Sequence, residues 1–303
     1  ESLVNAYKNK EGKSMNGIDS WVWEELGDYR EHLHLHTIEN PNYYVVYFNQ
    51  NKSKALSYEE VRKAISLATD KQQLIKEIFY DKATIANDPF LEESEGGEGE
   101  PSSWESRKEK ANALLEEKGW IRSEDGVRQR NGVRLEFDML TTDWREFTVG
   151  GDILSKQWNE IGVKINIKVV SVYDLWSNFI RPREYEMLFS AHMTTLIPDM
   201  YPFWHSSRTK DPGLNFSVYR NETLDVLIED LRITRDEGRR KEIIQKIEEI
   251  FHNDIPALYL FSADYLYPTD KNVQNISVSR VSEDADRFFD VENWYIKTKR
   301  IWK

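Results

Sequence analysis

The chain has 303 residues, of which 31% are charged and 39% hydrophobic, and its formal net charge is −12. This composition is typical of a soluble globular protein, and the length allows one large domain or two ordinary ones. The negative charge argues against a nucleic-acid partner, because there is no basic stripe to neutralise phosphates. The absence of cysteine excludes disulfides and thiolate chemistry. No run reaches the roughly 20 apolar residues that span a bilayer.

Residues 31–36, with the sequence EHLHLH, alternate strictly and predict a half-buried strand. A period of two places His32, His34 and His36 on one face and both leucines on the other. Histidines at positions i and i+2 of a strand can share a metal ion such as zinc. The favoured alternative leaves the histidines in solvent, since no acidic or thiolate partner follows at a compact spacing. We therefore predict no metal and no cofactor, and keep these three histidines as a secondary metal hypothesis.

Helix and strand patterns alternate from residue 57 to residue 189, after a β-branched and aromatic strand at 43–49. Ser57 begins a sequence typical of a capping box, and Asp70 offers a second helix N-cap. Further signals are a two-residue turn at Asn131-Gly132, a helix end at Gly162 and an alternating strand at 163–169. This order predicts an α/β lobe.

Residues 92–101, with the sequence EESEGGEGEP, combine glycine with like charges, which opposes an ordered structure. Carboxylates suit calcium, but the residue spacing of a calcium-binding loop is not kept. A solvated loop is therefore the favoured interpretation.

No catalytic constellation is recognisable in the sequence. Gly-x-Ser-x-Gly, Walker and dinucleotide-binding motifs are absent. Asp199 or Glu186 beside Trp204 could imitate the carboxylate pair of a glycosidase, but 53 acidic residues produce such combinations by chance. We predict that the protein is not an enzyme.

Two segments carry a resemblance to a known family. The first is the helix pair VRKAISLATDKQQLIKEIF at 61–79, and the second is the region 203–225, with Phe203-Trp204-His205-Ser206, Asn215-Phe216-Ser217-Val218-Tyr219-Arg220-Asn221 and Asp225. They resemble extracellular solute-binding proteins of family 5, the oligopeptide- and dipeptide-binding components of ABC importers. The resemblance covers nearly the whole chain but only the C-terminal half of a full family member, so we expect a fragment.

The resemblance implies an α/β fold: the C-terminal lobe of a bilobal periplasmic-binding-protein-like (class II) fold, with a mixed sheet flanked by helices. Residues 1–44 would be a remnant of the N-terminal lobe and a hinge strand. Residues 45–260 would form the ligand-binding lobe, and 261–303 would return toward the N-terminal lobe.

The resemblance also implies where a ligand is contacted. Matching the order of residues places His192 where the family has tryptophan, and Thr194 or Thr195 near an aspartate that pairs with a peptide's terminal ammonium. Asp199 then belongs to a later turn, or alternatively takes over the role of that aspartate. The remaining expected ligand-binding residues are Trp204, Tyr44, Tyr47 and Asn49.

The implied function is capture of a small solute, peptide or oligosaccharide-like, between two lobes by hinge closure, followed by delivery to an ABC transporter permease. The family is extracytoplasmic, either periplasmic or lipid-anchored at the outer face of the cytoplasmic membrane, and we expect a monomer. Alternatives are a sensor or presenting module with the same fold, or an oligosaccharide- or metal-chelate-binding member. Because the ammonium-pairing aspartate is replaced, an ordinary free peptide is not the expected ligand.

Overall fold

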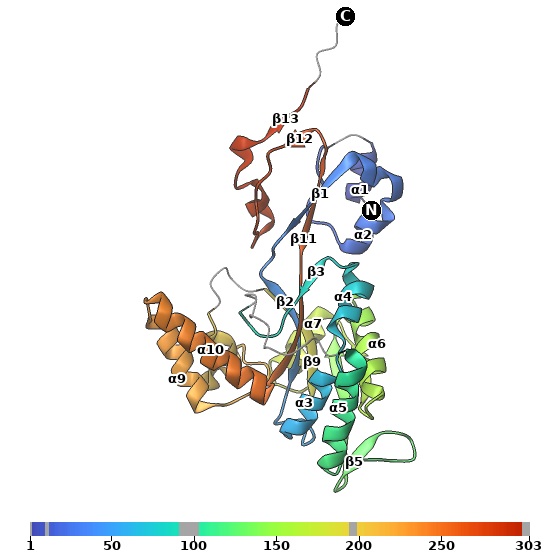
Figure 1. Ribbon diagram of the computed structural model, residues 1–303, viewed down its shortest axis with the longest axis vertical. Helices are drawn as coiled ribbons and strands as arrows, with labels where there is room; N and C mark the ends of the chain where they lie inside the picture. Colours follow the sequence, from blue (N-terminus) through green and yellow to red (C-terminus); the bar gives the residue numbers. More distant parts are fainter. Residues whose placement is uncertain (1, 10–11, 91–102, 194–198, 299–303) are drawn as a thin grey trace, which may run out of the picture.

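The computed structural model describes residues 2–9, 12–90, 103–193 and 199–298. Figure 1 shows a large lobe and a smaller one, joined by two long chain segments that run through both. The large lobe is built on a six-stranded sheet and the small lobe on a two-stranded ribbon.

The sheet of the large lobe is mixed, as predicted. Its strand order is β3 (Ala83–Ile85), β10 (Ala257–Ala263), β2 (Asn42–Phe48), β9 (Met187–Met193), β7 (Glu136–Thr141) and β8 (Lys164–Val169). Strand β7 is parallel to β8 and β9, whereas β2 is antiparallel to β9 and β10. The β-branched and aromatic composition of 43–49 therefore yields a central strand, which suits a pleated surface packed on both faces.

Helices cover both faces of this sheet (Figure 1). One face is covered by α3 (Glu59–Leu67), α4 (Lys71–Phe79), α5 (Trp104–Glu117) and α6 (Arg145–Asn159). The other is covered by α7 (Val172–Asp174), the π-helix η2 (Leu175–Ile180), α8 (Tyr201–Trp204), α9 (Glu222–Ile233) and α10 (Glu237–Asp254). Alternate residues of β2 serve the two cores: Val46 packs toward α3–α6 and Val45 toward α8–α10.

Local signals set several element boundaries. The Asp70 carboxylate accepts a hydrogen bond from the Gln73 N–H at 3.3 Å, so this predicted N-cap is confirmed. The capping box at Ser57 is wrong, because the N-cap is Tyr58 and the Ser57 hydroxyl instead donates to the carbonyl of Lys54. Asn131 and Gly132 both have positive φ between β5 (Arg128–Arg130) and β6 (Val133–Arg134), as a two-residue hairpin turn requires. Strand β4 (Ile121–Arg122) completes that small sheet, and η3 (Ser206–Arg208) follows α8.

The small lobe is organised around an antiparallel pair of strands, β1 (Leu33–Ile38) and β11 (Tyr265–Asp270). One face packs on α1 (Ser2–Lys8), α2 (Ser20–Glu25) and the 3-10 helix η1 (Gly27–His32). The other face carries the C-terminal segment with β12 (Val273–Gln274), η4 (Asp284–Phe288), η5 (Val291–Asn293) and β13 (Tyr295–Ile296).

Within the residues that the structure describes, the chain crosses between the lobes twice, at residues 39–41 between β1 and β2 and at Asp264 between β10 and β11. The crossings are tied together. The Ser262 hydroxyl donates to the carbonyl of Asn40 at 3.0 Å, and the Ala263 N–H donates to the Asn42 side chain at 3.2 Å. Division of the chain into units at residues 44 and 260 stays a prediction.

Candidate ligand-binding site

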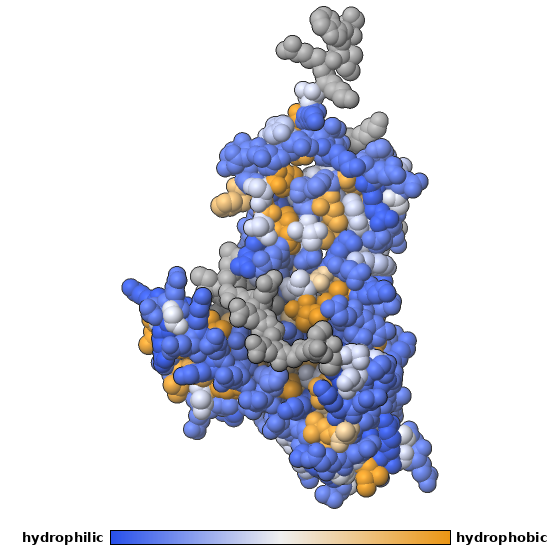
Figure 2. Space-filling model, viewed as in Figure 1, coloured by the Kyte–Doolittle hydropathy of each residue, from blue (hydrophilic) through white to orange (hydrophobic). Residues whose placement is uncertain are grey.

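Several strands of the large sheet end or begin on the side of the sheet that adjoins the crossings, and this side is called the strand-end edge below. Because β7, β8 and β9 are parallel, their carboxyl ends lie at one edge. Strand β2 begins at the same edge, since Asn42 pairs with Met193 at the end of β9. The carboxyl ends of parallel strands are the usual ligand-binding edge of an α/β sheet. On the face shown in Figure 2, hydrophobic side chains gather at the junction of the two lobes.

Three buried polar atoms at this edge have no hydrogen-bond partner among the described residues. They are Asn40 Oδ1 at the first crossing, Thr142 Oγ1 just after β7, and His192 Nε2 near the end of β9. A buried polar atom without a partner costs roughly 1–3 kcal/mol, and native structures keep few of them. Such atoms are able to bind a ligand that brings complementary donors and acceptors.

Exposed aromatic side chains flank the same edge, and the sequence analysis did not identify them. Trp144, which follows β7, is 57% exposed, and Tyr173, which follows β8, is 78% exposed. The Trp144 ring stacks on Phe147 at 6.1 Å between centroids, and Phe147 in turn contacts Tyr44. An indole that packs against another ring and is still exposed to solvent is suited to stacking on a ligand. The usable signal was the position of Trp144 shortly after the strand β7, which ends at Thr141.

His192 lies in β9 at this edge. Its ring packs edge-on against Phe203 at 4.0 Å and lies 5.3 Å from the ring of Tyr43. Burial lowers the pKa of the His192 imidazole to about 4. At neutral pH the side chain is therefore uncharged, and it can donate or accept one hydrogen bond without supplying charge.

The other residues expected near the end of β9 divide into two groups. Thr194 and Thr195 lie outside the described residues. Asp199 is exposed, accepts a hydrogen bond from the Tyr201 N–H at 3.1 Å and pairs with Arg232 at 3.2 Å. An ammonium group would have to compete with Arg232 for the Asp199 carboxylate.

Trp204 and Tyr47, which were expected to face a ligand, lie in the core of the large lobe. They are 1% and 2% exposed. Trp204 packs perpendicular to Phe251 at 4.6 Å, because α8 turns its indole inward beneath α10. The same burial removes Trp204 from any glycosidase-like pair with Asp199 or Glu186.

Tyr44 and Asn49 stand at opposite ends of β2. Burial, with Glu146 and Asp19 as nearby negative charges, raises the pKa of the Tyr44 hydroxyl. Since Asp19 belongs to the small lobe, Tyr44 lies beside the junction of the lobes. Asn49 is instead 1% exposed at the far end, where its amide donates to the Arg183 carbonyl at 3.1 Å. Asn49, which was expected to contact a ligand, therefore shapes a turn at the end of β2 away from the junction of the lobes.

The three histidines of residues 31–36 do not act as one set. His32 ends the 3-10 helix η1, so the strand begins at Leu33, two residues later than predicted. His34 and His36 do share a face of β1, and their ring centroids are 4.4 Å apart. Among the residues that the structure describes, no group of three or more His, Cys, Asp or Glu side chains could hold a metal ion.

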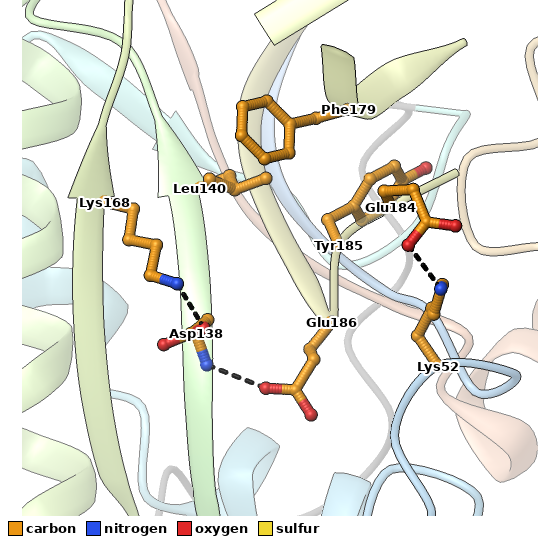
Figure 3. A pocket seen from close by; sticks show the side chains of 8 residues that line it. All are labelled: Lys52, Asp138, Leu140, Lys168, Phe179, Glu184, Tyr185 and Glu186. Atoms are coloured by element: carbon orange, nitrogen blue, oxygen red, sulfur yellow. Dashed lines mark hydrogen bonds and ion pairs between the residues drawn. The ribbon is translucent and has the colours of Figure 1, made fainter. Parts of the chain in front are cut away.

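Away from the strand-end edge, the large lobe contains a hollow near the start of β9 (Figure 3). It has a volume of about 320 Å³ and its charged side chains are Lys52, Asp138, Lys168, Glu184 and Glu186. The charges are largely matched internally: Lys168 pairs with Asp138 at 2.5 Å, and Lys52 pairs with Glu184. Glu186 accepts the Asp138 N–H at 2.9 Å. These pairs favour the strand-end edge over this hollow as the ligand-binding site.

A mixed α/β lobe is joined by two crossing segments to a second lobe beside its strand ends. This is the bilobal, periplasmic-binding-protein-like class II fold. A sequence profile described as "Bacterial extracellular solute-binding proteins, family 5 Middle" matches residues 1–213. The chain belongs to this family. No helix among the described residues has the length and apolar character needed to cross a membrane.

Several relatives share the sequence or the fold. The oligopeptide-binding protein AppA of Bacillus subtilis (strain 168) is 24% identical over 273 residues, covering 83% of this chain and 46% of its own length. The structure of NikA from Brucella suis in complex with Fe(III)-EDTA has a TM-score of 0.78 at 18% identity, covering 98% of this chain and 60% of that one. NikZ from Campylobacter jejuni in complex with Ni(L-His) has a TM-score of 0.76 at 20% identity, covering 96% and 58%. This chain spans about half the length of the curated relatives it matches.

Proposed function

We propose that this protein is the solute-binding component of an ABC importer and that its solute binds at the edge where β7, β8 and β9 end. The unpartnered buried atoms of Asn40, Thr142 and His192 at that edge carry the proposal. The exposed ring of Trp144 supports it, because an open aromatic face beside buried polar groups is typical of small-molecule sites. The chain then works by binding and release, without a chemical step.

The proposed mechanism is closure of the two lobes around the solute. Among the described residues only two segments cross between the lobes, and hinge motions concentrate in a few residues at such crossings. The hydroxyl of Tyr44, near Asp19 of the small lobe and Glu146 of the large one, lies where the approaching surfaces meet.

We further propose that the chain is part of a longer polypeptide, because it spans 46% of the length of AppA. The additional residues would enlarge the small lobe and complete the second wall of the site. The protein would act outside the cytoplasm, as a monomer that docks on a membrane permease.

The pairing of Asp199 favours a solute without a free terminal ammonium. Asp199 is the carboxylate expected to take over the ammonium-pairing role, and it is already paired with Arg232. His192 is neutral, and its buried Nε2 atom offers one hydrogen bond. A metal chelate is a second candidate solute, since NikZ and NikA were solved with Ni(L-His) and Fe(III)-EDTA.

Calorimetry on the full-length protein tests the proposal. The probes are a tetrapeptide, its N-acetylated form, an oligosaccharide and nickel–histidine. We expect binding of at least one probe that lacks a terminal ammonium, with the ligand recovered intact. Nanomolar binding of the free tetrapeptide, abolished by acetylation, would refute the assignment of ligand class. Turnover of the peptide or oligosaccharide would refute the binding-protein assignment itself.

A further inference from the structure

We propose that His34 and His36 form a two-histidine site for a divalent transition-metal ion on the small lobe. The site is distinct from the strand-end edge of the large lobe and does not depend on the function proposed above.

The first observation is that both imidazoles are fixed on one face of a paired strand. His34 lies opposite Thr269 and His36 opposite Tyr267 in the β1–β11 register. Alternate strand residues point to the same side, so the two rings are neighbours, with centroids 4.4 Å apart. When two imidazoles bind the same tetrahedral metal ion, with metal–nitrogen distances of roughly 2.0–2.1 Å, their ring centres are about 5 Å apart. The separation of the two rings is therefore close to that of two imidazoles that share one ion.

The second observation is a partner that can fix the orientation of one ring. Nε2 of His36 lies 3.1 Å from the hydroxyl of Thr269, which is fully buried. When Nε2–H donates to that hydroxyl, the lone pair of Nδ1 is left for a metal. Metal-binding histidines usually donate their other ring N–H to such an acceptor, which sets the tautomer and the ring orientation.

The third observation is open space with further ligand atoms. His34 and His36 line a cavity of about 360 Å³ together with Lys271, Gln274 and Asn275. The side-chain nitrogen of Gln274 donates to the carbonyl of Lys271 at 2.6 Å, so its amide oxygen remains as an acceptor. Beside His36, the Tyr267 hydroxyl is buried and has no partner among the described residues.

These features define the class of ligand. Two imidazoles favour Ni²⁺, Cu²⁺ or Zn²⁺ over Mg²⁺ or Ca²⁺, which prefer oxygen ligands. Two protein nitrogens leave coordination positions open, and the nearby Lys271 ammonium favours an anionic molecule, such as a carboxylate, in those positions.

The test is titration of tag-free protein with Ni²⁺ alone in a buffer free of chelators. We expect one ion per chain, with the dissociation constant rising at least about tenfold in His34→Ala and in His36→Ala. His32→Ala is the matched control, because His32 lies in η1 outside the cavity. Its dissociation constant should match that of the unaltered protein.

X-ray absorption at the nickel edge supplies a readout that loss of folding cannot mimic. We expect two imidazole ligands on the nickel ion in the unaltered protein and one in His34→Ala. The side chain of His34 is exposed, so its removal should change the stability of the fold little. Absence of Ni²⁺ binding, or equal binding in a His34→Ala/His36→Ala double variant, would overturn the proposal. Either result would leave solute binding at the strand-end edge untouched, since His34 and His36 lie on the small lobe.

Discussion

His192 is a partly buried imidazole in β9 whose Nε2 atom is fully buried, so its protonation is coupled to folding. Burial lowers its pKa to about 4, from an ordinary value of 6.5. Between these values the unfolded chain binds a proton that the folded chain does not, so stability falls as the pH falls. The slope from this one group is up to about 1.4 kcal/mol per pH unit.

We therefore expect His192→Gln to flatten the loss of stability between pH 6.5 and pH 4. Urea unfolding at pH 7, 5.5 and 4.5 measures the effect. His252→Gln is the control, because His252 is exposed in the last turn of α10. If both variants lose stability with acid as steeply as the unaltered protein, the His192 imidazole is not the group responsible.

Trp144 permits a separate test of the binding edge. Its ring is 57% exposed, so Trp144→Ala should cost less than about 1 kcal/mol of folding stability. If the indole stacks on the solute, affinity should fall roughly tenfold or more in calorimetry. Tyr29→Ala, an exposed aromatic in η1 of the small lobe, is the comparison. Equal affinity in the two variants would remove Trp144 from the site.

At the scale of elements, Asp70 and Ser57 both precede a helix, but only the Asp70 side chain caps the helix that follows it. Asp70→Ala should lower the free energy of unfolding by about 1 kcal/mol, because the carboxylate accepts the Gln73 N–H. Ser57→Ala should cost less, since that hydroxyl binds an exposed carbonyl before the helix begins. Chemical denaturation of both variants measures the difference, and a larger loss in Ser57→Ala would contradict the capping assignment.

The same contrast shows what local sequence can predict. β-Branched and aromatic composition predicted β2, periodicity predicted β8, and turn chemistry predicted the hairpin at Asn131-Gly132, because those signals act over a few residues. Periodicity also separates the two faces of β2 but does not say which face α8 will cover. For that reason Tyr47 was expected at a ligand, whereas Trp204 of α8 packs against it.

Parts of the site depend on pairing between distant segments, which no local pattern specifies. The pairing of His36 with Tyr267 and the approach of Asp19 to Tyr44 both depend on how the chain returns between lobes. The strand-end edge was anticipated only where the family resemblance extended to it, at His192. Trp144 and Thr142 were missed, since the sequence does not show that β7 and β9 end side by side.

At the scale of the whole molecule, the two crossings make lobe closure the property to test. The crossings at 39–41 and Asp264 are joined by the bond from Ser262 to Asn40, so both should bend together. We expect the radius of gyration of the full-length protein to decrease when solute is added, as measured by X-ray scattering in solution. The 303-residue chain alone, which would present one complete wall, should bind the same solute more weakly and show a smaller change. Tight binding by the 303-residue chain without any compaction would mean that the edge of the large lobe suffices as a site and that closure is not part of the mechanism.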